Sequence, residues 1–133
     1  MGKRFKLDIT VDKTTVAPRE PIKTTATFKN LSDSFYQVVT GLYLIGFGIF
    51  KKDEERLINE ITVAVFRTID KNLTEVKTME HSFKDKGEYC IMANAKFRII
   101  STDNEKQIEY EKIKISELEQ IYLVAEEITI NVN

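Results

Sequence analysis

The sequence predicts an all-β protein built from antiparallel strands. Apolar residues alternate with polar ones in short blocks and do not recur at helical spacing, which is typical of half-buried strands. Stretches rich in Pro, Asn, Asp and Ser, such as "VAPREPI" and "NLSDS", separate the blocks and are typical of turns. The chain has 133 residues and shows no repeat or linker, so we expect a single domain spanning residues 1–133.

The first two blocks are the clearest strands. In each block one set of alternate residues is apolar or small, and this set should face the core. The core-facing sets are Phe5, Leu7, Ile9 and Val11 in the first strand and Ile22, Thr24, Ala26 and Phe28 in the second.

The stretch "FYQVVTGLYLIGFGIF", residues 35–50, is apolar on both faces. Gly41 predicts either two strands or one strand with a bend. Two interpretations stay open: the fold covers the stretch on both sides, or its aromatic residues include an exposed row that contacts a partner or a second copy of the chain. The candidate interface residues are Tyr36, Tyr43, Phe47 and Phe50. The stretch has 16 residues and three glycines, so it is too short and too interrupted for a transmembrane helix.

Alternation predicts further strands in the second half of the chain. They cover residues 57–67, a strand containing Val76 and Met79, residues 88–100 and residues 128–132. The strand at residues 88–100 should be the longest.

Two segments between these strands are harder to interpret. Ile108 and Tyr110 share a phase that Ile113 and Ile115 break, which predicts a strand with a bulge near residues 111–112. In residues 116–125, Ser116 and Glu119 match a capping box and favour a short helix, while the following apolar residues also fit a strand. Both interpretations of residues 116–125 stay open.

The residues that begin the longest strand carry a resemblance. Asp85, Gly87 and Tyr89 have the spacing of the tyrosine corner of immunoglobulin-like sandwiches, in which the tyrosine hydroxyl bonds to upstream backbone. Ile91 stands where an antibody-type domain has its second cysteine, and the chain has no tryptophan, so an antibody-type core is excluded. The resemblance implies an immunoglobulin-like β-sandwich of seven to nine strands.

A second stretch, "VAPREPIKTTATFKNLSD", resembles immunoglobulin-like domains that lack the disulfide. They are fibronectin type III-like modules, CARDB-type prokaryotic domains and the bacterial intracellular proteinase inhibitor family. Arg19 stands before Glu20 where those relatives usually have a glycine. Both matching stretches are structural motifs, so the resemblance implies a fold rather than an activity.

The sequence offers little for catalysis, and we expect no enzyme. Cys90 lies on the polar set of its strand and is expected to be a structural thiol, and His81 is the one histidine available to activate it. Acidic clusters at residues 53–55, 103–105 and 126–127 lack the spacing of a known metal-binding loop. We therefore expect no catalytic, cofactor-binding or metal-binding residues, and no cofactor.

The charge of the chain disfavours nucleic acid as a partner. The net charge is −1, so no uniform basic field exists to hold a phosphate backbone. Residues 1–30 carry seven Lys and Arg against three acidic residues, and residues 101–133 carry three against eight. We expect these two ends to attract each other across the fold.

From these observations we expect a non-catalytic protein-binding or assembly module. The alternatives are an intracellular protease inhibitor and a surface or envelope component whose anchor lies outside this chain. The start "MGKRFKLDIT" enters a strand pattern rather than a signal peptide, and a single cysteine fits a reducing compartment. We therefore expect a cytoplasmic protein of a prokaryote or of one of its viruses, with a cell-surface or virion location as the alternative. The Lys, Glu and Ile content is compatible with a thermophile.

Overall fold

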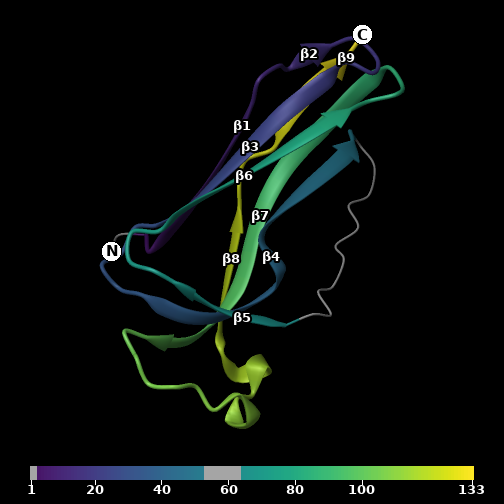
Figure 1. Ribbon diagram of the computed structural model, residues 1–133. Coiled ribbons are helices and arrows are strands. Elements are labelled where there is room, and N and C mark those ends of the chain that lie inside the picture. Colours follow the sequence, from purple (N-terminus) through teal and green to yellow (C-terminus); the bar gives the residue numbers. More distant parts are fainter. Residues whose placement is uncertain (1–2, 53–63) are drawn as a thin grey trace.

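The computed structural model describes residues 3–52 and 64–133. Within these ranges the chain forms nine strands in two sheets that pack as a sandwich (Figure 1), which confirms the all-β class and the expected number of strands. The strands are β1 (Phe5–Val11), β2 (Thr15–Val16), β3 (Pro21–Asn30), β4 (Tyr36–Lys51), β5 (Val65–Ile69), β6 (Thr74–Ser82), β7 (Gly87–Thr102), β8 (Glu119–Val124) and β9 (Ile128–Val132).

The smaller sheet has the order β1-β3-β6, and both of its pairings are antiparallel. Its central strand β3 buries the face that the alternation predicts: Ile22, Thr24, Ala26 and Phe28 are 0% exposed. The opposite face of β3 carries Lys and Thr residues that are exposed or half-buried, as expected for a two-layer sandwich.

The larger sheet has the order β2-β9-β7-β4-β5, with β8 also paired to β7. β9 pairs with residues 87–91 of β7, and β8 pairs with residues 94–99 on the same edge, because β4 occupies the other edge. Residues 125–127 separate β8 from β9, and Ala125 donates its N–H to the carbonyl of Ala93 at 2.9 Å. The short β2 pairs with β9 in parallel, so the sheet departs from the purely antiparallel arrangement that the sequence predicts.

Aromatic rings from both sheets meet in the core. Phe5 of β1 lies 5.1 Å from both Tyr36 and Phe97 between ring centres, and Phe28 lies 5.9 Å from Phe97. All four side chains are buried. Burial of one large apolar side chain stabilises a fold by about 1.5–3 kcal/mol, so this cluster is a main contribution to the packing of sheet on sheet.

Asn30 at the end of β3 ties two turns together. Its side-chain amide donates to the carbonyls of Ser34 and Asp70, each at 2.9 Å, and its Oδ1 accepts from the backbone N–H of Ser32 at 3.1 Å. The side chain is 2% exposed, and these hydrogen bonds satisfy its polar atoms in the interior.

The segment before residue 116 does not form the predicted strand. The bulged strand predicted over Ile108–Ile115 is wrong: short 3-10 turns form at Tyr110–Lys112 and Ile115–Glu117. Tyr110 of this segment contacts Phe66 of β5 at 4.3 Å between ring centres. In Figure 1 the segment lies beside β5, at the end of the molecule away from the C-terminus.

Residues 119–124 form the strand β8, which decides between the two interpretations of residues 116–125. Ser116 lies within the second 3-10 turn and begins no α-helix. Ile121 and Leu123 are half-buried and pack against the core, while their neighbours are exposed, and this alternation suits the edge of β7 better than a helix. Of the strand predicted over residues 57–67, residues 57–63 lie outside the described residues.

Candidate functional site

A large bulge in β4 exposes two adjacent residues with large side chains, Leu42 and Tyr43. Thr40 pairs with Phe97 and Ile45 pairs with Ala95, so the four residues 41–44 of β4 lie opposite the single residue Lys96 of β7. The three extra residues break the alternation of the strand and redirect its side chains. As a result Leu42 and Tyr43 are each 63% exposed, although the next residue, Leu44, is 4% exposed.

Lys77 of β6 holds the inner side of this bulge. Its ammonium donates a hydrogen bond to the carbonyl of Ile45 at 2.8 Å. The same ammonium lies 4.0 Å from the ring centre of Tyr43 and 5.8 Å from that of Phe47, within the range of cation–π attraction. Lys77 therefore fixes both the backbone and the aromatic side chain of the bulge.

The four candidate interface residues do not form one row. Tyr36 is 3% exposed and lies in the core beside Phe5. The prediction that Tyr36 could belong to an exposed interface is therefore wrong. Phe47 is half-buried and packs against the core from the inner face of β4. Tyr43 is exposed at the bulge, and its exposed neighbour Leu42 was missing from the sequence-based set. A leucine among so many apolar residues gives no signal that separates it from the core.

Phe50, the fourth candidate, covers the outer face of the larger sheet. A Cβ placed on Gly48 would lie 2.8 Å from the Phe50 ring and 3.0 Å from the Met92 side chain, so the glycine leaves room for these two groups. Met92 is 7% exposed as a result. Phe50 is half-buried and belongs to the packing of this face rather than to a projecting surface.

The tyrosine corner residues lie together where the sequence places them. The hydroxyl of Tyr89 donates to the carbonyl of Asp85 at 2.9 Å, and the Tyr89 ring lies 4.2 Å from the ring of Phe83. Gly87 has a φ of +148°, a conformation that favours glycine. The Tyr89 ring is half-buried, so it is less buried than the tyrosine of a fully buried corner would be.

The turn at Arg19 holds a side chain in a backbone conformation that favours glycine. Arg19 has a φ of +68°, in the left-handed region that disfavours a side chain. Its N–H donates to the carbonyl of Phe83 at 2.6 Å, which joins this turn to the tyrosine corner. The Ala17 N–H donates to the Glu20 carboxylate at 3.0 Å and, with Lys13, lowers the pKa of Glu20.

Cys90 and His81 do not form a nucleophilic pair. Cys90 is half-buried on the outer face of β7, and His81 lies on β6 in the other sheet, where its ring contacts Phe83 at 4.8 Å. Activation of the thiol needs a base within hydrogen-bond reach. The placement of these two side chains therefore offers no such chemistry.

Asp103, in the acidic cluster at residues 103–105, makes a hydrogen bond within the fold. Asp103 accepts a hydrogen bond from the N–H of Phe35 at 3.0 Å. Hydrogen bonds from Ser34 and then from Phe35 lower the pKa of the Asp103 carboxyl. Within residues 3–52 and 64–133 no three His, Cys, Asp or Glu side chains gather in a way that could hold a metal ion. The acidic cluster at residues 53–55 lies outside the described residues.

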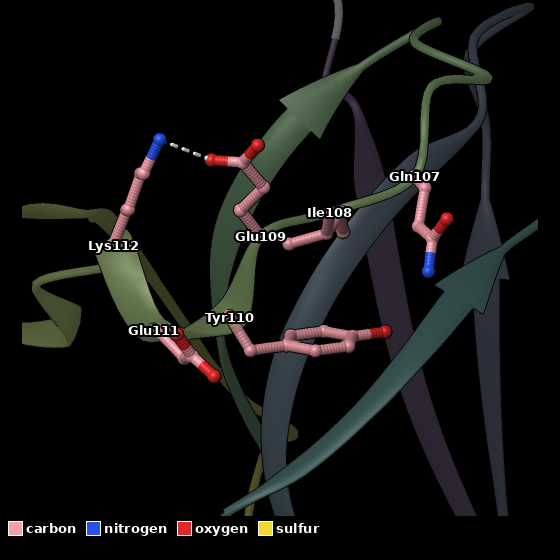
Figure 2. A pocket seen from close by; sticks show the side chains of 6 residues that line it. All are labelled: Gln107, Ile108, Glu109, Tyr110, Glu111 and Lys112. Carbon is pink, nitrogen blue, oxygen red and sulfur yellow. Dashed lines mark ion pairs between the residues drawn. The ribbon is translucent and has the colours of Figure 1, made fainter.

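An open pocket of about 630 Å³ lies in the segment between β7 and β8. Figure 2 shows described residues that line it: Gln107, Ile108, Glu109, Tyr110, Glu111 and Lys112. They are consecutive in the chain, and the Lys112 ammonium lies 2.6 Å from the Glu109 carboxylate within the same 3-10 turn. The Tyr110 ring points toward β5. Among the residues that the structure describes, those that line the pocket all belong to this one segment of the chain.

An ion pair joins the basic region at residues 1–30 to the acidic region at residues 101–133, in line with the expected attraction between them. Arg4 reaches Glu119 with two hydrogen bonds of 2.5 and 3.3 Å between guanidinium and carboxylate. The hydrogen bond from Arg4 lowers the pKa of Glu119, and the carboxylate raises the pKa of Arg4. The pair links the strand β8 to the residue before β1 and closes one side of the sandwich.

No protein-family model, no curated protein and no solved structure matches this chain. The class that the fold itself defines is an all-β sandwich of two sheets. No helix in the described part of the chain has the length and apolar character needed to cross a membrane.

Proposed function

We propose that this protein is a non-catalytic binding module whose contact surface is centred on Leu42 and Tyr43. The observation that carries the proposal is the exposure of both side chains, 63% each, on a bulge whose next residues are buried. The partner is a protein, either a different chain or a second copy of this one.

The bulge supports binding because the fold does not require its apolar side chains. Polar residues at positions 42 and 43 would project into water equally well and would avoid exposing apolar area. Large apolar side chains that project together are typical of contact surfaces, and tyrosine is enriched among residues that dominate binding energies. Tyr43 is also held in place by Lys77, so it loses little conformational freedom on binding.

We further propose that the sandwich belongs to the immunoglobulin-like class and acts in the cytoplasm of a prokaryote or of one of its viruses. The tyrosine corner at Asp85 and Tyr89 and the left-handed turn at Arg19 support the kinship with disulfide-free modules of this class. The bulge lies within a strand rather than in a projecting loop, and this favours a binding module over a protease inhibitor.

Site-specific photocrosslinking tests the proposal. A photoreactive phenylalanine analogue replaces Tyr43 in one variant and Tyr122 in a matched control, because Tyr122 is 49% exposed on β8. In extracts of the native host we expect a discrete crosslinked product from position 43 only. Purified partner should then bind Leu42→Asp at least about tenfold more weakly than the parent protein, a loss of at least 1.4 kcal/mol.

Two results would contradict the proposed surface. One is equal crosslinking from positions 43 and 122, which would indicate that labelling follows exposure alone. The other is unchanged affinity of the Leu42→Asp variant for the captured partner. A crosslinked product with twice the mass of the chain would identify the partner as a second copy.

A further inference from the structure

The strand β6 has an edge that should invite pairing with another strand. It pairs with β3 over residues 74–82 without a register shift, and it contains no Pro or Gly. Within residues 3–52 and 64–133 no strand pairs with its other edge. A long and regular edge presents N–H and C=O groups to any chain that approaches, and this is the usual route to edge-to-edge association.

The inward face of β6 differs sharply from that of its neighbour β3. Each inward residue of β3 from Ile22 to Phe28 is 0% exposed, whereas the β6 residues directly opposite are half-buried and mostly polar. The opposed pairs are Ile22 with His81, Thr24 with Met79, Ala26 with Lys77 and Phe28 with Glu75. The edge strand therefore points charge at the core side of the sheet.

The charged side chains of Lys77 and Glu75 contact the other sheet and remain partly exposed to water. Lys77 donates to the carbonyl of Ile45 in β4 at 2.8 Å. Glu75 pairs with Arg67 of β5 at 2.8 Å, and these two side chains are 33% and 31% exposed. A strand added to β6 would place its own side chains beside Lys77 and Glu75 and remove water from both groups. Loss of hydration from a charged group is unfavourable unless a new partner replaces the water.

We propose that Lys77, assisted by Glu75, keeps β6 from pairing with β6 of a second copy of this chain. Inward-pointing charge is one of the means by which an edge strand resists pairing. The same ammonium contacts the Tyr43 ring at the bulge. Lys77 would therefore act both at the β6 edge and at the proposed contact surface. The proposal concerns β6 alone and holds whether or not the bulge binds a protein.

The test replaces Lys77 with isoleucine, an apolar residue of high β-propensity. Thr78→Ile is the matched control, because it adds the same side chain to the same strand on the outward face. Lys77→Arg keeps the charge and should behave as the parent protein. Mass is measured by light scattering over a concentration series, with circular dichroism to confirm the fold.

We expect Lys77→Ile to raise the self-association constant by about tenfold or more, and both controls to leave it unchanged. Hydrogen exchange in the associated species should slow at residues 74–82. If Lys77→Ile does not fold, Glu75→Thr serves as the second variant, with the same expected direction.

Three results would overturn the proposal. A folded Lys77→Ile variant that associates no more than the parent shows that the charge does not protect the edge. Equal association of Thr78→Ile attributes the effect to added apolar surface. Loss of the association when Leu42→Asp is added to Lys77→Ile assigns the contact to the bulge instead of to β6.

Discussion

Tyr89 shows how a single side chain can be placed from the sequence. Its spacing from Asp85 and Gly87 predicts a hydroxyl bonded to upstream backbone, and the structure has this bond to the Asp85 carbonyl at 2.9 Å. The degree of burial could not be predicted, because it depends on Phe83, which packs beside the ring from outside the motif.

The Tyr89→Phe variant should be less stable than the parent by about 0.5–1 kcal/mol, the net value of one hydrogen bond that is partly open to solvent. Tyr122→Phe, which removes a hydroxyl from a tyrosine that is 49% exposed, should change the free energy of unfolding by less. Urea denaturation of the three proteins measures both differences. Equal stability of Tyr89→Phe and Tyr122→Phe would show that the corner bond contributes nothing.

At the level of the element, β4 contains one feature that the sequence predicts and one that it hides. Gly41 correctly marks the point where the regular strand is interrupted. The buried residues Tyr36 and Val38 have even numbers, whereas after the bulge the core-facing residues Ile45 and Phe47 have odd numbers. An apolar pattern on both faces hides this change of phase. Tyr36 and Tyr43 therefore could not be assigned to the core and the surface from periodicity alone.

The ion pair between Arg4 and Glu119 makes a contribution to the free energy of unfolding that depends on pH, because the Glu119 carboxylate can be protonated. Arg4 lowers the pKa of Glu119 in the folded protein below its unfolded value, which is about 4.3 for glutamate. The contribution is therefore complete above the unfolded pKa and is lost as the pH falls through the folded pKa. Both side chains are about half exposed, so the pair is in the class of surface ion pairs that contribute about 0–1 kcal/mol.

We expect Glu119→Gln to be less stable than the parent by up to about 1 kcal/mol at neutral pH and low salt. The difference should shrink as the pH falls and as salt is added, because protonation and screening both weaken the pair in the parent. Urea denaturation across pH gives the comparison, with Glu126→Gln as a control at an exposed position. A difference that grows toward low pH would have the wrong sign for this account.

At the scale of the whole molecule, polar contacts bridge the two sheets on opposite sides of the sandwich. Arg4 and Glu119 join β8 to the chain before β1, and Lys77 and Glu75 join β6 to β4 and β5. The charge asymmetry of the sequence predicts the first contact, because it places opposite charges at the two ends of the chain. The contact of Lys77 could not be predicted, because its partner is the backbone carbonyl of Ile45, which lies in the other sheet.

The sandwich itself could be predicted from period-two alternation and turn residues, since these reflect local geometry. The segment between β7 and β8 could not, because it forms short 3-10 turns, in which apolar residues do not follow the period of a strand. The central claim of this account concerns the bulge of β4, where apolar side chains two residues apart are assigned different roles: Leu42 to binding and Leu44 to the core.

The most direct test of this claim is the free energy of unfolding of Leu42→Ala and Leu44→Ala, measured by urea denaturation of the purified protein. Both changes remove the same atoms from the same bulge. Their effects on strand propensity and on the unfolded state should therefore be similar in the two variants. We predict that Leu44→Ala costs about 2–5 kcal/mol, as for a buried leucine, and that Leu42→Ala stays within about 0.5 kcal/mol of the parent. A cost of about 2 kcal/mol or more for Leu42→Ala would show that Leu42 belongs to the folded core, and would contradict the assignment of the bulge as a binding surface.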